Sequence, residues 1–182
     1  MLVIQGSDAG GHGLAKSSSI ITLLPECVDA LASHGFGAIP IIAAGGIVDG
    51  RGVAAAIVLG ASGVCMGTRF LASPEAQIAN GYRKDILRAR DGGVSTGRTS
   101  LYDKLRGTVG WPEGYNGRGV LNESFWDAGK GMGEDENKKL YEEALKLGDE
   151  GWGKKGRVTG MCYFAPAFVI RYYDSKLLGT FF

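Results

Sequence analysis

A single histidine within a run of glycines is the strongest candidate for chemistry in this sequence. His12 lies in the segment Gln5–Gly13 (QGSDAGGHG), directly after a short apolar run. An imidazole exchanges protons near neutral pH, and glycines let the backbone approach a ligand closely. In α/β proteins, turns of this kind follow strands and present catalytic groups at the carboxyl edge of the sheet. We therefore predict that His12 transfers a proton within a ligand-binding turn.

Two further glycine turns predict an anion site. The segments Ala43–Ile47 (AAGGI) and Met66–Arg69 (MGTR) each stand where a predicted strand passes into a predicted helix. Backbone N–H groups in such turns bind phosphate, and the positive end of a helix strengthens the binding. The alternative is that these glycines only make tight turns.

The pattern around these turns alternates strands with helices. Apolar runs predict strands at 2–4, 39–44 and 64–66, and the continuous run at 39–44 is typical of a strand buried on both faces. Helices are predicted by the spacing of apolar residues from Ile20 to Leu31, by Val53–Leu59 after a possible Asp49 cap, and by a start near Pro74–Glu75. This order predicts an α/β fold with parallel strands.

Composition excludes several other classes. The 182 residues carry a net charge of +1 without a basic stripe, which argues against nucleic acid as a partner. The apolar stretch 161–170 is too short to span a membrane. Cys27, Cys65 and Cys162 lie too far apart for a disulfide framework or a metal site, which favours a reduced, intracellular location, with the cytoplasm as the expected compartment.

The second half of the chain differs in character. Gly, Trp, Tyr and Asn crowd Leu101–Gly133, and a charged helix is expected from Glu134 to Leu147. This part is expected to cover a site rather than to add sheet. Its aromatic side chains are expected to pack within the cover: Trp111, Tyr115, Trp126 and Trp152. The tail 158–182 shows no period that predicts an element.

Together, the three motifs resemble the nitronate monooxygenase (2-nitropropane dioxygenase) family. The likeness extends through Met66–Leu71 (MGTRFL), and the segments Leu101–Arg106 (LYDKLR) and Gly110–Pro112 (GWP) resemble fungal-type members. It spans roughly residues 2–157. The tail does not resemble the family's closing segment, as expected from a wrong exon boundary or reading frame.

The resemblance implies a partial TIM (β/α)8 barrel, from about strand 5 to strand 8, with a helical and loop cover. Its segments would be 1–100 (carboxyl-terminal half of an FMN-binding barrel), 101–157 (cover over the flavin) and 158–182 (atypical tail). The expected beginning near the fifth strand makes the chain the carboxyl-terminal part of such an enzyme. His12 would be the catalytic base. The implied FMN contacts are Gln5, Gly10, Gly11, Gly45, Gly46, Cys65, Met66, Gly67 and Thr68.

The implied reaction converts an alkyl nitronate or nitroalkane and O2 into an aldehyde or ketone plus nitrite, with FMN performing the redox step. Small molecules are thus the expected partners, and no oligomeric state is predicted. Cys65 and Met66 are expected to meet the flavin through their backbone rather than through sulfur.

Several alternatives stay open. One alternative is another FMN barrel with the same turns, such as a flavin-dependent enoyl reductase. Another is that the chain is a truncated fragment without activity. A P-loop at Gly10–Ser17 is disfavoured because Ala15 stands where that motif needs glycine. Asp8 is expected either to orient His12 or to stabilise the turn. His34 is expected to be a surface cap at a helix end.

Overall fold

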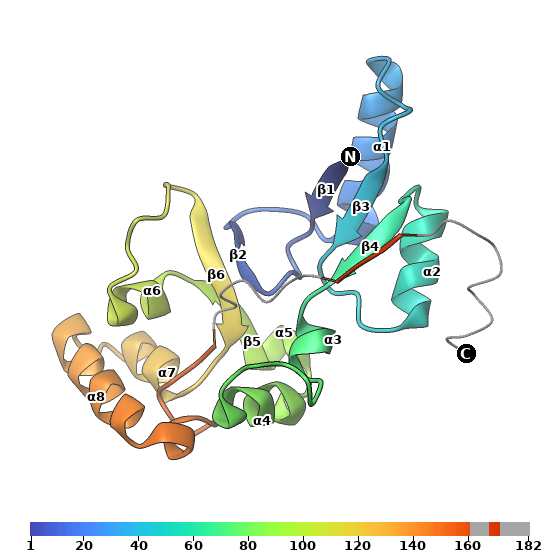
Figure 1. Cartoon of the computed structure of the whole chain (residues 1–182). Helices are drawn as coiled ribbons and strands as arrows, with labels where there is room; N and C mark the ends of the chain where they lie inside the picture. Colours follow the sequence, from blue (N-terminus) through green and yellow to red (C-terminus); the bar gives the residue numbers. More distant parts are fainter. Residues whose placement is uncertain (161–167, 172–182) are drawn as a thin grey trace. The chain divides into compact units, whose positions relative to one another are not determined.

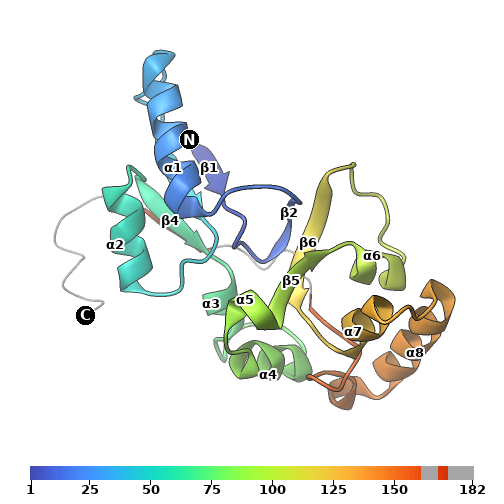
Figure 2. The ribbon, with the colours of Figure 1, turned by 180° about the vertical axis from the view of Figure 1, so that it is seen from behind.

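The computed structural model describes residues 1–160 and 168–171, and these residues form a mixed α/β fold (Figures 1 and 2). The chain divides into two compact units. Unit 1 comprises Met1–Ala9, Lys16–Phe70 and the segment from Pro166, whereas unit 2 comprises Gly10–Ala15 and Leu71–Ala165. The functional segments 1–100, 101–157 and 158–182 rest on the family resemblance, and they stay a prediction.

Unit 1 is built on a four-stranded sheet in the order β1-β3-β4-β7. The strands β1 (Leu2–Gln5), β3 (Ile41–Ala44) and β4 (Gly63–Met66) are parallel, and β7 (Phe168–Arg171) pairs antiparallel with β4. The predicted run of βαβ units is therefore confirmed. Strand β3 begins after Pro40, whose ring lacks the N–H that a ladder position needs.

Two helices connect the parallel strands, and both were predicted. Helix α1 (Ile20–Ser33) links β1 to β3, and α2 (Gly50–Val58) links β3 to β4. Asp49 caps α2, because its carboxylate accepts a hydrogen bond from the Arg51 N–H at 3.0 Å. A side-chain hydrogen bond from Arg51 lowers the pKa of Asp49 to about 2.

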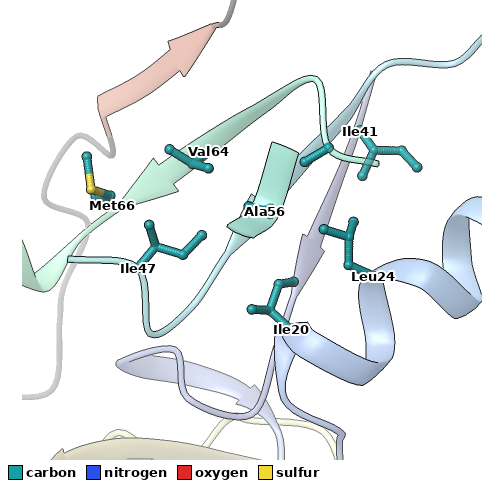
Figure 3. Packing of buried hydrophobic residues seen from close by; sticks show 9 residues of the cluster. Ile20, Leu24, Ile41, Ile47, Ala56, Val64 and Met66 are labelled. Atoms are coloured by element: carbon teal, nitrogen blue, oxygen red, sulfur yellow. The ribbon is translucent and has the colours of Figure 1, made fainter. Parts of the chain in front are cut away.

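Apolar side chains fill the space between the sheet and these helices (Figure 3). All four residues of β3 are buried, as expected for a strand covered on both faces. Helix α1 contributes Ile20 and Leu24, which lie one helical turn apart on one face. Leu24 is fully buried. Cys27 and Cys65 carry free thiols, and Cys162 lies outside the described residues.

The helix predicted near Pro74–Glu75 is wrong. After the short α3 (Thr68–Leu71), the next helix is α4 (Asn80–Arg88). The intervening segment forms short turns, in one of which the Ala76 N–H donates a hydrogen bond to the Ser73 carbonyl. The Arg83 guanidinium donates to the Ala76 carbonyl at 2.6 Å and so occupies an acceptor that a helix would need.

Unit 2 contains a second, antiparallel sheet that the sequence reading missed. Its order is β2-β6-β5, with β2 (Gly11–Leu14), β6 (Tyr115–Val120) and β5 (Thr96–Thr99). The expectation that Leu101–Gly133 adds no sheet is wrong, because β6 lies inside this segment. The expectation of a plain turn at Gly11–Gly13 is also wrong, since these residues pair with β6. Glycine lowers strand propensity, which hid both strands from pattern analysis.

Helices surround this second sheet. They are α4, α5 (Gly92–Ser95), α6 (Leu101–Arg106), α7 (Glu123–Gly129), α8 (Glu134–Lys146) and the 3-10 turn η1 (Gly148–Gly151). The charged helix predicted from Glu134 is confirmed as α8. Among the described residues, a search for helices long and apolar enough to cross a membrane returned none.

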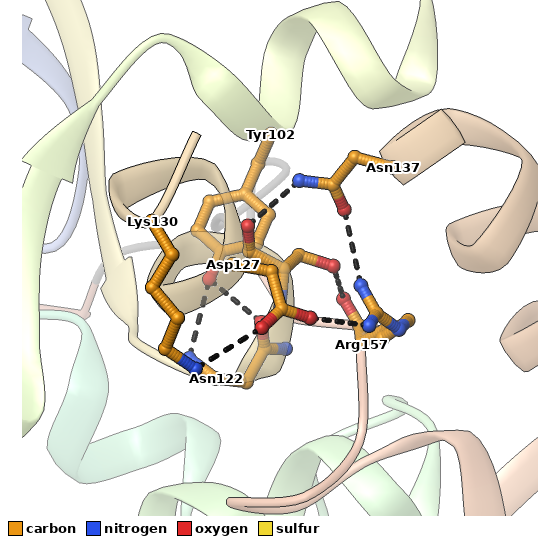
Figure 4. A network of polar contacts seen from close by, with 7 residues as sticks. Tyr102, Asn122, Asp127, Lys130, Asn137 and Arg157 are labelled. Carbon is orange, nitrogen blue, oxygen red and sulfur yellow. Dashed lines mark hydrogen bonds and ion pairs between the residues drawn. The ribbon is translucent and has the colours of Figure 1, made fainter. Parts of the chain in front are cut away.

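A buried polar network joins three of these helices to the segment that follows η1 (Figure 4). The Tyr102 hydroxyl donates to Asn122 Oδ1 at 2.8 Å, and Asn122 Nδ2 donates to the Val158 carbonyl at 2.9 Å. Arg157 bonds Asn137 and Asp127. Burial raises the pKa of Tyr102, and the hydrogen bond from Arg157 lowers that of Asp127. Buried polar groups of this kind are stabilising only when they are paired, as they are here.

The network also includes the first residues of the predicted tail. Val158 and Thr159 are buried in unit 2, and the Thr159 hydroxyl donates to the Val120 carbonyl at 2.7 Å. Residues 161–167 and 172–182 of the predicted tail lie outside the described residues.

Replacing Leu24 with alanine tests the core of unit 1. Leu24→Ala should lower the free energy of unfolding by about 2–5 kcal/mol, because it removes a fully buried side chain and leaves a cavity. Leu87→Ala is the matched control, since Leu87 is 57% exposed, and it should change the value by less than about 0.5 kcal/mol. Urea titration followed by circular dichroism measures both. Equal effects of the two substitutions would contradict this core.

Candidate functional site

The carboxyl ends of three parallel strands gather the predicted cofactor residues of unit 1. Gln5 is in register with Ala44, and Ala44 is in register with Cys65. The Gly6 N–H donates to the Ala44 carbonyl at 2.9 Å, which extends the ladder past the end of β1. The turns after β1, β3 and β4 therefore leave the sheet at one edge, where open α/β sheets bind ligands.

Gly45 and Gly46 have a structural reason to be glycine. Their φ angles are +111° and +73°, a backbone conformation that residues other than glycine rarely adopt. A Cβ on Gly45 would lie 2.9 Å from the Ala9 nitrogen, so this turn packs directly on the turn after β1. A Cβ on Gly46 would lie 3.1 Å from the Asp8 Cβ. The tight-turn alternative thus accounts for both residues, whether or not they also contact a ligand.

Gly67 is different, because the described residues do not require glycine there. No heavy atom of the described residues lies within 4 Å of a Cβ built on Gly67, and its φ is not in the left-handed region. The residue is exposed, as is the neighbouring Thr68, whose hydroxyl could donate to an anion. The space beside Gly67 can therefore hold a ligand against the backbone.

Sulfur is poorly placed for chemistry at this edge. Met66 is 7% exposed, and its side chain packs into the core of unit 1 (Figure 3), which keeps its sulfur away from a ligand. Burial raises the pKa of the half-buried Cys65 thiol, which is therefore protonated at neutral pH.

Asp49 is the N-cap of helix α2, so a negative charge already stands at the positive end of this helix. The contribution of this helix end to an anion site stays a prediction. Any anion held after β3 would depend on the backbone of Gly45 and Gly46.

His12 lies in unit 2, on strand β2, where it is in register with Gly117 of β6. Its Nε2 lies 3.0 Å from each carboxylate oxygen of Asp103 on α6. The Asp103 carboxylate is 6% exposed, and the imidazole is 15% exposed. The ring also stacks on Trp111, with the centroids 3.7 Å apart and the planes 10° from parallel. A buried carboxylate and an indole therefore hold the candidate base.

Sequence reasoning missed the partner of His12. Asp103 lies 91 positions away, so no local pattern could connect the two residues. Asp8, one candidate for orienting His12, belongs to unit 1 and lies beside Gly46. Its two expected roles stay predictions. Trp111 was expected to pack within the cover, and its contact is the imidazole itself. It remains 46% exposed.

The predicted site residues fall on both sides of the division between the units. Gln5, Gly45, Gly46, Cys65, Met66, Gly67 and Thr68 lie in unit 1, whereas Gly10, Gly11 and His12 lie in unit 2. The second histidine is separate from both groups. His34 ends α1, where its Nδ1 lies 2.8 Å from the Ala30 carbonyl oxygen, and it is exposed, so the predicted surface cap is confirmed.

Comparison with known proteins connects both groups of residues to one family. Residues 1–104 match the family described as nitronate monooxygenase. Nitronate monooxygenase npaC of Metarhizium robertsii is 49% identical over 98% of this chain and 49% of its own length. A nitronate monooxygenase of Neurospora crassa is 42% identical over 82% of this chain and 40% of its own length. The chain thus spans about half the length of these relatives.

A solved structure agrees at the level of the fold. The nitroalkane oxidase from Streptomyces ansochromogenes superposes with a TM-score of 0.60 over 87% of this chain and 44% of that protein, at 22% identity. The family resemblance expected from the glycine motifs and the LYDKLR segment is confirmed. The chain belongs to the nitronate monooxygenase family.

Proposed function

We propose that this chain carries the FMN-binding turns and the base of an enzyme that oxidises alkyl nitronates with O2 to an aldehyde or ketone plus nitrite. The observation that carries the proposal is the meeting of three glycine-containing turns at the carboxyl edge of β1, β3 and β4. Family membership supplies the reaction class. The proposed architecture is the strand 5 to strand 8 part of a TIM (β/α)8 barrel, in which ligands bind at this edge.

The residues of unit 1 fit a phosphate-bearing flavin. Gly67 leaves room for a ligand at the backbone, and Thr68 adds an exposed hydroxyl. In this proposal the chain holds FMN through Gln5, Gly10, Gly11, Gly45, Gly46, Cys65, Met66, Gly67 and Thr68. When bound, FMN supplies the electron transfer. Met66 takes part through its backbone only, because its side chain is buried in the core.

His12 supplies proton transfer in this proposal. A neutral imidazole accepts the proton on the carbon next to a nitro group, and the resulting imidazolium stabilises the nitronate anion. The hydrogen bond to Asp103 stabilises the charged ring after it has accepted the proton. Substrate and O2 are the proposed small-molecule partners, and the cytoplasm is the proposed location.

Gly67→Ala tests flavin binding apart from catalysis. The substitution should leave folding unchanged, because the added methyl meets no atom of the described residues. It should weaken FMN binding about tenfold or more, a cost of about 1.4 kcal/mol, because the methyl would occupy ligand space. Gly129→Ala is the matched control, since its Cβ also meets nothing and it lies at the end of α7. Quenching of flavin fluorescence during titration measures both affinities.

Two results would contradict the flavin proposal. Equal FMN affinity in Gly67→Ala and Gly129→Ala would remove Gly67 from the site. A folded chain that binds no FMN at any concentration would favour the inactive-fragment alternative.

His12→Asn tests the base in the FMN-loaded chain. Turnover of a neutral nitroalkane should fall by about 10²–10⁴-fold, because proton abstraction is lost, whereas a preformed nitronate needs no abstraction and should lose less. Nitrite release under air measures both substrates, and His34→Asn is the control. Equal losses on the two substrates would exclude the base role. NADH or NADPH oxidation by an enoyl thioester, without nitrite release from nitronate, would favour the reductase alternative.

A further inference from the structure

We propose that Asp103 is the positioning residue of His12: it fixes the imidazole as the tautomer that is protonated on Nε2, which makes Nδ1 the basic nitrogen. The use of this base in nitroalkane oxidation rests on the function proposed above. The placement of the proton does not, because it follows from contacts within unit 2.

The hydrogen-bond geometry determines the direction of the bond. His12 Nε2 is 3.0 Å from both Oδ1 and Oδ2 of Asp103. An ionised carboxylate only accepts hydrogen bonds, so Nε2 must carry the proton that lies between the two groups. A neutral imidazole has one N–H, and its lone pair is then on Nδ1. Asp103 therefore selects which ring nitrogen can accept a proton.

The local chain holds the Asp103 carboxylate in place. Helix α6 ends at Gly107, which adopts φ +76°, and this left-handed turn reverses the chain. After this reversal, the Thr108 N–H donates a hydrogen bond to the Asp103 carbonyl at 2.9 Å, and the Thr108 hydroxyl donates one to Asp103 Oδ1 at 3.1 Å. The segment Asp103–Thr108 (DKLRGT) thus holds the Asp103 carboxylate by a hydrogen bond to one of its oxygens.

Two other contacts restrain the ring in different directions. Trp111 covers a face of the imidazole with nearly parallel stacking, which fixes the ring plane. Strand pairing with β6 fixes the backbone of His12, and the residue opposite, Gly117, adds no side chain. Asp103 fixes rotation within the plane, because it engages one edge of the ring. The three restraints together orient the ring, and the contact with Asp103 is the one that selects the tautomer.

Asparagine at position 103 should reverse this choice. The Thr108 hydroxyl would still donate to the oxygen in the Oδ1 position, so the amide NH2 would take the place of Oδ2, which lies 3.0 Å from Nε2. The amide then donates to Nε2, so that the ring proton must move to Nδ1. In Ser-His-Asp triads the same exchange leaves the geometry intact and gives the wrong tautomer.

Nitrogen-15 NMR of histidine reads the tautomer without flavin or substrate. The chain has only two histidines, so His34→Gln assigns the His12 signals. In the neutral imidazole of the unsubstituted chain, the Nε2 shift should be that of a protonated nitrogen and the Nδ1 shift that of an unprotonated one. The opposite assignment, or an equal mixture, would overturn the proposal, and this measurement needs no substitution at Asp103.

Asp103→Asn provides the second test, with Asp85→Asn as its matched control. Both carboxylates are buried in unit 2, at 4% and 2% exposure for the whole residue, but Asp85 bonds Arg88 rather than His12. Asp103→Asn should move the proton to Nδ1, whereas Asp85→Asn should leave it on Nε2. A folded Asp103→Asn chain that keeps the Nε2 proton would limit Asp103 to a structural role and overturn the proposal.

Activity of the FMN-loaded chain separates this inference from the function on which it rests. Asp103→Asn should lower turnover of a neutral nitroalkane by about 10²-fold and turnover of a preformed nitronate by less, because only the former needs the base. Equal losses would overturn the positioning role. Absence of nitrite release from the unsubstituted chain would instead contradict the proposed function, and the NMR result would still decide how Asp103 acts on His12.

Discussion

The parallel register of β1, β3 and β4 is the constraint on which unit 1 depends. Because Gln5, Ala44 and Cys65 are held side by side by ladder hydrogen bonds, the chain must leave the sheet at one edge three times. A shift of one residue would exchange the side chains of β3 between its two buried faces and so disrupt the packing of the core that contains Leu24. The same register that buries the core therefore positions the turns, so the stability of unit 1 and the geometry of its site have one cause.

The glycines at this edge separate into two kinds. Gly45 cannot accept a side chain, because its turn packs on the backbone of Ala9 and its φ is positive. A side chain at Gly67 would meet no atom of the described residues. Packing therefore explains the glycine at position 45 and does not explain the glycine at position 67. The distinction matters because the sequence motifs alone present these residues as equivalent.

The parallel strands of unit 1 and the helices that connect them could be predicted because their patterns are local. Apolar runs and helical spacing reveal β3 and α1, and Asp49 followed by a helix is a local signal for a cap. The sheet of unit 2 could not be predicted in this way. Strands β2 and β6 are rich in glycine, which obscures the alternation of a half-buried strand. The segment after Pro74 forms turns instead of a helix, because Arg83 bonds the Ala76 carbonyl that a helix would use. The pairing of His12 with Asp103 is a tertiary contact across 91 positions, which no local pattern encodes.

Polar contacts position His12 in unit 2, whereas the apolar core positions the turns in unit 1. Helix α6, which carries Asp103, also carries Tyr102, and the hydroxyl of Tyr102 bonds the buried side chain of Asn122. Adjacent residues of one short helix thus connect to the buried network and to the candidate base. Since hydrogen bonds are directional and an unpaired buried group is costly, this network allows fewer alternative packings than an apolar contact of similar size. The orientation of a proton-transferring group requires that kind of restraint, because the position of one proton depends on the direction of one bond.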